Sequence, residues 1–337
     1  MTRDIFIQEV ALRDGLQIEQ TWVPTREKVR LADSLSRIGF SRIEVTSFVS
    51  PKAVPALRDA AEVFAAIDRA PGGVYVALVP NRRGAENALA AGADELNFVV
   101  SSSDLHNMAN MGMSSDASFE AFEQAIPLAL EKNVLVNGTI ATAFGCPFEG
   151  AQAEGRVLAL VERFLSLGVG GITLADTTGM ANPLQVRRLV QQALLLVRPE
   201  QLTLHFHNTR GLGIANLLAA FDVGARRFDA ALGGLGGCPF APGASGNICT
   251  EDVVNMCHDM GLATGLALPE LIALSRTLPA ILGHELPGQV MKAGRNCDLH
   301  PWPRSEGQRR EGEKGSFAMP GAGALSGADL LLNSQVG

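Results

Sequence analysis

Four glycines of the chain share one spacing that constrains the fold. Each ends a segment with a helical pattern, and the first core residue of an apolar run follows four residues later. The pairs are Gly39 with Ile43, Gly92 with Leu96, Gly168 with Ile172, and Gly224 with Phe228. A glycine in the left-handed conformation commonly closes a helix, and a short loop then leads into the next strand. The repeat therefore predicts a series of βα units.

Eight short runs rich in apolar residues alternate with longer amphipathic segments. The predicted strands cover residues 5–10, 42–47, 74–79, 95–100, 134–141, 171–176, 202–208 and 228–233. One predicted helix covers 24–39, where Pro24 suits the first turn and Gly39 the end. Eight such units over about 250 residues are typical of a (β/α)8 TIM barrel. The alternative, an open doubly wound sheet, lacks its glycine-rich loop after the first strand, where "VALRDGLQ" stands.

The C-terminal part of the chain has a different pattern. Residues 269–283 predict one additional helix, whereas residues 284–337 are rich in Gly, Pro, Arg and Glu without periodicity. We expect one barrel domain over residues 1–283 and a disordered tail over residues 284–337.

The composition favours small-molecule partners. A net charge of −7 with interspersed acids and bases indicates neither a nucleic-acid footprint nor a basic membrane-binding face. No uninterrupted apolar stretch approaches eighteen residues, and the start "MTRDIFIQEV" resembles a strand rather than a cationic leader. We therefore expect a cytoplasmic protein that binds no nucleic acid and no membrane. Five cysteines without a CxxC pair argue against a disulfide framework or a structural zinc site.

The active site of a TIM barrel lies where the strands end, so polar residues there are the candidates for function. They are Arg13, Asp14 and Gln17 after the first strand, Glu44 in the second, Asp176 after the sixth, His205 and His207 in the seventh, and Cys238 and Asn247 after the eighth. Residues two apart on a strand face the same side, so His205 and His207 point the same way.

The histidine pair, with Asp14 across the barrel, favours a metal site over a pair of histidines that bond only to carbonyl groups. Imidazole, carboxylate and amide oxygen together suit Mg²⁺ or Mn²⁺ better than tetrahedral zinc. We expect Asp14 to supply the negative charge and Asn247 a neutral oxygen. Zinc or cobalt in the same site is the alternative.

Six motifs occur in a fixed order: "RDGLQ", "IEVTSFVSPK", "FGCPFEG", "LADTTG", "HFH" and "GGLGGCPFAPGASGN". Over residues 4–265 this set resembles the 3-hydroxy-3-methylglutaryl-CoA lyase family of the DRE-TIM metallolyases. The resemblance implies metal ligation by Asp14, His205, His207 and Asn247, with His205 also in the catalytic set. It implies that Arg13 stabilises a carbanion, that Glu44 and Asp176 are site carboxylates, and that Cys238 is an acid/base on a glycine-rich loop. Gln17 is expected to contact the bound cofactor.

The activity that the resemblance implies is carbon–carbon cleavage of an acyl-CoA, with acetyl-CoA and acetoacetate as products and a role in leucine degradation. Glycines on both sides of Cys238 allow its loop to approach a substrate closely. A homodimer is expected because apolar helices outside a barrel often pair.

Several positions depart from the pattern of the family. Thr139 stands where a tyrosine is usual and Asn208 where an aspartate is usual, and the usual lysines are absent at Gln20 and within residues 106–113. A larger or different acyl group, or a substrate other than a CoA ester, is therefore an alternative. A condensing synthase or aldolase acting on a 2-oxo acid, and a noncatalytic binding barrel, are the other readings.

Overall fold

A computed structural model describes residues 3–237, 246–299 and 301 of the chain. Its eight strands are all parallel and pair in sequence order, with β1 closing on β8. They are β1 (Phe6–Glu9), β2 (Arg42–Ser47), β3 (Val74–Leu78), β4 (Glu95–Ser101), β5 (Leu135–Ala141), β6 (Gly171–Asp176), β7 (Leu202–Phe206) and β8 (Arg227–Ala230). This closed sheet confirms the predicted (β/α)8 TIM barrel, and each observed strand overlaps a predicted one.

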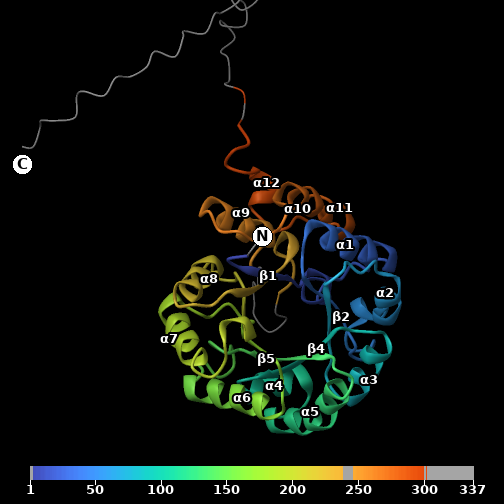
Figure 1. The fold of residues 1–337 in the computed structure, drawn as a ribbon, viewed down its shortest axis with the longest axis vertical. Helices are drawn as coiled ribbons and strands as arrows, with labels where there is room; N and C mark the ends of the chain where they lie inside the picture. The colour runs from blue at the N-terminus through green and yellow to red at the C-terminus, as the bar shows by residue number, and fades with distance from the viewer. Residues whose placement is uncertain (1–2, 238–245, 300, 302–337) are drawn as a thin grey trace, which may run out of the picture. The chain divides into compact units, whose positions relative to one another are not determined.

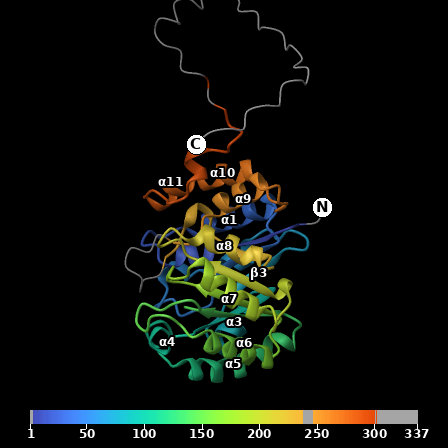
Figure 2. The same ribbon diagram turned by 90° about the vertical axis from the view of Figure 1, so that its left-hand side faces the viewer.

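Helices follow the strands and surround the barrel (Figure 1). They are α1 (Thr25–Ile38), α2 (Ala60–Ala66), α3 (Arg82–Ala90), α4 (Asp104–Met111), α5 (Ser115–Leu130), α6 (Glu154–Ser166), α7 (Pro183–Ala193), α8 (Gly213–Asp222) and α9 (Thr250–Asp259). Three more, α10 (Leu268–Ser275), α11 (Leu278–Leu282) and α12 (Val290–Ala293), lie near α1 and α9 at one side of the ring (Figure 1). Figure 2 shows α10 and α11 beside α9 at one end of the barrel in the side view. None of the described helices combines the length and the apolar character that a membrane crossing requires.

The four spaced glycines end helices as predicted. Their φ angles are 115° at Gly39, 78° at Gly92, 82° at Gly168 and 111° at Gly224. At Gly39, which caps α1, a Cβ would lie 2.6 Å from the carbonyl oxygen of Gly265. Positive φ and close packing therefore both require glycine at this turn.

The structure corrects three boundaries. The predicted helix at 269–283 is two helices, α10 and α11, because Pro279 lies in the first turn of a new helix. Strand β8 ends at Ala230 rather than residue 233, since Gly233 and Gly234 have positive φ in the short helical turn η4 (Leu232–Gly234). The ordered chain also extends past residue 283, where α12 buries Met291. A compact first unit ends at Arg295, and the rest of the predicted tail lies almost entirely outside the described residues.

Candidate active site

Arg13 and Asp14 lie on η1 (Ala11–Gly15), a π-helical turn that follows β1 directly. The backbone N–H groups of Arg13, Asp14 and Gly15 all donate to the carbonyl oxygen of Val10. The side chain of Arg13 is nearly buried, and its Nε donates to Glu44 Oε2 at 2.7 Å while Nη1 donates to Asp14 Oδ1 at 2.6 Å. This tight turn therefore presents a cation and an anion side by side at the end of the barrel.

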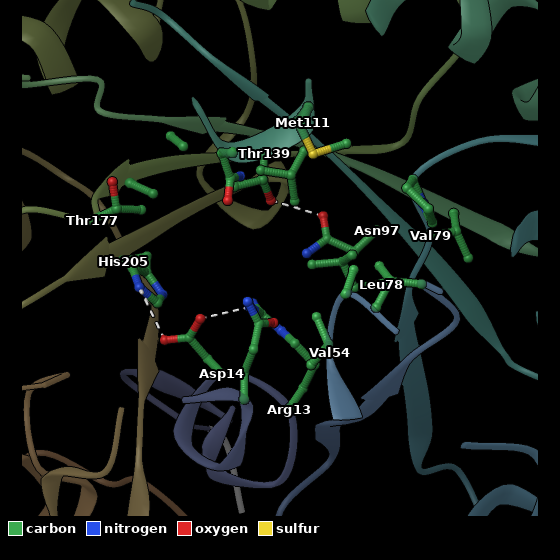
Figure 3. Close-up of a pocket in the computed structure, with 18 of the residues that line it drawn as sticks. Arg13, Asp14, Val54, Leu78, Val79, Asn97, Met111, Thr139, Thr177 and His205 are labelled. Atoms are coloured by element: carbon green, nitrogen blue, oxygen red, sulfur yellow. Dashed lines mark hydrogen bonds and ion pairs between the residues drawn. The ribbon is translucent and has the colours of Figure 1, made fainter. Parts of the chain in front are cut away.

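His205 and His207 point to the same side of the β7 segment, as their spacing predicts. Their Nε2 atoms lie 3.0 Å apart. Asp14 Oδ2 lies 3.7 Å from Nε2 of His207 and 4.0 Å from Nε2 of His205. Figure 3 shows Asp14 facing His205 across the edge of the pocket. The ligand atoms of these three residues lie within 4.8 Å of one another, so one ion can contact all three.

Asn247 completes the group. Its Nδ2 donates to Asp14 Oδ2 at 2.7 Å and to the carbonyl oxygen of Leu235 at 3.0 Å. Its Oδ1 is buried and accepts no hydrogen bond from the described residues. Gly236 packs against it so closely that a Cβ there would lie 2.6 Å from Asn247 Nδ2. This buried oxygen lies near a carboxylate and two imidazoles, which are groups that ligate divalent cations. Rotation of the amide would turn the oxygen towards an ion at that place, and the ion would use its free lone pair.

Asp229 on β8 also belongs to the site, and the sequence analysis missed it. Its Oδ2 lies 3.1 Å from Nδ1 of His205. A proton on Nδ1 that faces this carboxylate leaves Nε2 with a lone pair for a metal, which is the usual arrangement behind a ligating histidine. The sequence feature that could have identified Asp229 is a single acidic residue within the apolar strand "FDAA". In the barrel, Asp229 pairs in register with His205.

A buried polar network holds the carboxylate of Glu44, and the sequence analysis missed two of its members, Asn97 on β4 and Asn137 on β5. Asn97 donates to Glu44 Oε1 at 2.9 Å, and Asn97 Oδ1 accepts hydrogen bonds from Thr139 at 2.7 Å and from Asn137 at 3.0 Å. Figure 3 shows the bond between Thr139 and Asn97 at the pocket wall. Thr139 therefore orients Asn97, which orients the carboxylate that holds Arg13.

The electrostatics keep the turn charged. Burial by itself would raise the pKa of Asp14, but the charge of Arg13 and the hydrogen bond with His207 hold this pKa well below its ordinary value. Burial raises the pKa of Glu44, and Arg13 opposes part of that rise. Burial lowers the pKa of His205, yet Asp229 and Asp14 together bring it above the ordinary value. Asp14 is thus an anion at neutral pH, as a cation ligand must be.

The structure does not bring every predicted residue to the pocket. Asp176 accepts backbone hydrogen bonds from Met180 at 2.8 Å and Ala181 at 3.1 Å, so its carboxylate organises its own turn, and it is absent from the described lining of the pocket. Its expected role as a site carboxylate stays a prediction. Burial raises its pKa to about 6. Gln17 lines the pocket. Cys238 lies outside the described residues.

The pocket has a volume of about 340 Å³ and extends from the histidine pair to the strand ends of β2, β3 and β4. Together with the barrel, it defines the class of the protein: a TIM-barrel enzyme with a candidate divalent-cation site at the carboxyl ends of its strands. The HMGL-like family matches residues 4–278, and the chain belongs to this family. The resemblance inferred from the six motifs is thereby confirmed.

Three relatives illustrate the family. Hydroxymethylglutaryl-CoA lyase YngG of Bacillus subtilis is 42% identical over 86% of this chain and 97% of its own length. The (R)-citramalyl-CoA lyase of Chloroflexus aurantiacus is 42% identical over 86% of this chain and 95% of its own. A solved HMG-CoA lyase from Acinetobacter baumannii, in complex with coenzyme A and 3-methylmalate, is 62% identical, covers 89% of this chain and 98% of its own, and superposes with a TM-score of 0.87.

Proposed function

We propose that this protein is a cation-dependent lyase that cleaves 3-hydroxy-3-methylglutaryl-CoA to acetyl-CoA and acetoacetate. The observation that carries the proposal is the convergence of Arg13 with Asp14, His205, His207 and Asn247 at one end of a pocket, in a chain of this family. The relatives named hydroxymethylglutaryl-CoA lyases support the choice of substrate.

Asp14, His205, His207 and Asn247 are the residues that would hold the cation, and Mg²⁺ or Mn²⁺ is the proposed ion. When bound, such an ion supplies Lewis acidity, which lowers the pKa of a substrate hydroxyl group. Both nitrogens of His205 are committed, Nδ1 to Asp229 and Nε2 to the ligand cluster, so we assign this residue a ligand role rather than that of a proton acceptor.

Arg13 is proposed to stabilise the charge that develops during cleavage. The hydroxyl group of the substrate loses its proton, the bond between C2 and C3 breaks, and its electron pair forms the enolate of acetyl-CoA. Burial lowers the pKa of the Arg13 side chain, but Glu44 and Asp14 raise it above its ordinary value, so it stays cationic. A fixed cation beside a developing negative charge lowers the barrier by about 3–4 kcal/mol, the effect of a single preorganised donor. Cys238 is proposed, on the family resemblance, to protonate the enolate carbon.

We propose citramalyl-CoA as a second candidate substrate because two similar proteins point to it. One relative is named a citramalyl-CoA lyase, and the structure that is 62% identical was solved with 3-methylmalate. In citramalyl-CoA the carboxylate is attached directly to the carbinol carbon, one methylene shorter than in 3-hydroxy-3-methylglutaryl-CoA. Thr139, which lines the pocket where the family usually has a tyrosine, changes the chemistry of that wall from an aromatic ring to a small hydroxyl side chain. The homodimer, the cytoplasmic location and the role in leucine degradation stay predictions.

The test is an assay of chelator-stripped protein with and without added Mn²⁺ or Mg²⁺. We expect cleavage only with the cation, with acetoacetate released from 3-hydroxy-3-methylglutaryl-CoA or pyruvate released from citramalyl-CoA, and the faster reaction identifies the substrate. Full activity of the stripped protein would contradict the cation proposal. Condensation of acetyl-CoA with a 2-oxo acid, without cleavage of either thioester, would instead favour a synthase. If neither cleavage nor condensation is detected in any assay, a noncatalytic binding protein is favoured.

A further inference from the structure

The carboxylate of Glu44 holds two residues of the pocket wall, one on each oxygen. Its Oε2 accepts a hydrogen bond from Nε of Arg13 at 2.7 Å and lies 2.6 Å from Nη2, and its Oε1 accepts from Nδ2 of Asn97 at 2.9 Å. Arg13 and Asn97 belong to the described lining of the pocket, whereas Glu44 is only 1% exposed and does not. Glu44 therefore lies behind the wall and holds a guanidinium and an amide as neighbours. Figure 3 shows both side chains facing the same part of the pocket.

The hydrogen bonds around Asn97 fix which end of its amide faces Glu44. The carboxylate that pairs with Arg13 accepts hydrogen bonds, so the amide turns Nδ2 toward it. At the other end, Oδ1 accepts from the hydroxyl of Thr139 at 2.7 Å and from Nδ2 of Asn137 at 3.0 Å. The amide of Asn97 is therefore oriented from both ends before any ligand binds.

Both side chains keep N–H donors that the described residues do not use. An amide nitrogen has two hydrogens, and Nδ2 of Asn97 uses one of them on Glu44. Each nitrogen of the Arg13 guanidinium uses one hydrogen on Glu44 or Asp14, so each terminal nitrogen has a second. Donors in the wall of a pocket that lack an acceptor from these residues are available for a ligand oxygen.

We propose that Asn97 is a catalytic residue that donates its second Nδ2 hydrogen to the thioester oxygen of the substrate, which becomes the enolate oxygen during cleavage. This inference rests on the proposed function, in which Arg13 stabilises the same charge. A cationic and a neutral donor held by one carboxylate suit a single oxygen that gains negative charge, because neither donor has to reorient as the charge develops.

The free carboxylate of the acyl group is the other oxygen that could accept this hydrogen. Such a carboxylate would face the negative charge of Glu44 already in the bound substrate. The thioester oxygen is neutral until the carbon–carbon bond breaks, so it meets no repulsion when the substrate binds. The charge distribution behind the wall therefore favours the thioester oxygen.

Thr139 is the positioning residue in this arrangement, since it acts through Asn97. Replacing it with Val keeps the shape of the side chain and removes the hydroxyl that donates to Asn97 Oδ1. Asn137 is then the one described residue that still donates to this oxygen, so the amide can turn away from Glu44. Thr139→Ser keeps the hydroxyl.

The first experiment measures steady-state cleavage of the better thioester substrate by the full chain with its cation. For Asn97→Ala we expect kcat to fall about a hundredfold, the effect of one lost oxyanion donor, with KM within about twofold, because the contact strengthens only as charge develops. Thr139→Val should lower kcat less, and Thr139→Ser should restore most of that loss. Asn87→Ala, on the exposed face of α3, is the matched control that should leave kcat unchanged. Urea denaturation checks that each variant is folded.

A double variant separates a direct contact from an effect through Glu44 and Arg13. If Asn97 acted only by holding that carboxylate, its replacement would have no further effect once Arg13 is replaced by Gln. We expect Asn97→Ala to lower the kcat of the Arg13→Gln variant by about a further tenfold or more. The absence of a further loss would overturn the inference.

Hydrogen exchange of acetyl-CoA identifies the oxygen that Asn97 contacts. In D2O, the group that protonates the enolate in the cleavage direction removes a methyl proton from acetyl-CoA, and a deuteron from the solvent then returns to the carbon. Mass spectrometry measures the exchange, and Asn97→Ala should slow it by about the same factor as cleavage. Unchanged exchange with a raised KM for cleavage would overturn the inference, since Asn97 would then contact the carboxylate that acetyl-CoA lacks.

The outcomes distinguish this assignment from the proposed function. If the wild-type protein cleaves a thioester and Asn97→Ala cleaves it at the same rate, the assignment of Asn97 fails and the proposed function stands. If the wild-type protein cleaves no thioester, the proposed function fails and the assignment fails with it.

Discussion

Arg13 has two carboxylate partners, and the geometry gives them different tasks. Glu44 is almost fully buried and receives Nε of Arg13, and Asn97 holds its second oxygen. Asp14 is the partner that also faces the histidine pair. At the scale of single residues, one carboxylate therefore anchors the guanidinium, and the other joins it to the candidate cation site.

Replacing Arg13 with Gln should lower kcat by about two orders of magnitude or more, because the fixed positive charge beside the developing enolate is lost. Steady-state kinetics with 3-hydroxy-3-methylglutaryl-CoA measures the effect. Arg82→Gln, on the exposed side of α3, is the control that should leave kcat unchanged. An unaltered rate in Arg13→Gln would remove this residue from the mechanism.

Replacing Asp229 with Ala should weaken Mn²⁺ affinity by about 10–100-fold, because His205 loses the carboxylate that fixes its tautomer and orientation. A Mn²⁺ titration of chelator-stripped protein, followed by electron paramagnetic resonance, gives the affinity directly. Asp222→Ala at the end of α8, which removes only a surface ion pair, is the comparison. Equal affinities in the two variants would mean that Asp229 does not support the ligand.

At the scale of elements, the sequence predicted the strands and helices whose positions depend on hydrophobic periodicity and on proline and glycine at their ends. Strand positions followed from short apolar runs, and α1 followed from Pro24 and Gly39. The division of residues 269–283 into two helices was missed because the amphipathic pattern continues through Pro279. Asp229 and Asn97 were missed for another reason: they point into the barrel from within strands, and only the closed register brings them to His205 and Glu44. For Asp176, which was chosen for its residue type at a strand end, the structure adds that each carboxylate oxygen accepts one backbone hydrogen bond from the following turn.

Gly39, which caps α1, allows a test of the glycine repeat from which the βα units were predicted. Gly39→Ala should destabilise the protein more than Gly72→Ala, although both glycines have positive φ, at 115° and 76°. A Cβ at Gly72 meets open space, so only backbone strain of about 1–2 kcal/mol is expected there. At Gly39 the Cβ also approaches the carbonyl oxygen of Gly265. Urea denaturation of both variants measures the difference, and equal losses would contradict the role of this contact.

At the scale of the whole molecule, one buried carboxylate joins three segments that are distant in sequence. Glu9 Oε1 accepts backbone hydrogen bonds from Ala11 at 2.8 Å and Leu232 at 2.9 Å, and its Oε2 accepts the hydroxyl of Thr250 at 2.8 Å. It therefore connects the end of β1 to η4 and to the start of α9. This closure joins the first and last βα units behind the active site.

The same residue makes the stability of the protein depend on pH. Burial raises the pKa of Glu9 from 4.5 to about 8. The negative charge of Glu251 adds to this rise, and the hydrogen bonds that Glu9 accepts oppose it. Between these two pH values the folded state holds a proton that the unfolded state has lost, so the free energy of unfolding falls as pH rises from about 4.5 to 8. The substitution Glu9→Gln replaces the titrating carboxyl group with an amide of nearly the same shape, so this contribution to the pH dependence is lost.

We therefore expect the stability of Glu9→Gln relative to the wild type to increase over that pH interval. Urea denaturation at pH 5.5, 7 and 8.5 measures it, with Glu120→Gln on the exposed face of α5 as the control. A difference between Glu9→Gln and the wild type that is the same at all three pH values would contradict the raised pKa.

The five-residue turn after β1 bears on how such an enzyme can diverge. Arg13 and Asp14 are consecutive, and three amide groups of their turn converge on the carbonyl oxygen of Val10. An insertion or deletion there would displace the guanidinium and the carboxylate in a single event. Exchange of the side chain at position 13 alone, by contrast, would remove the guanidinium and leave Asp14 beside the histidine pair, so such a change could end catalysis without disturbing the candidate cation site.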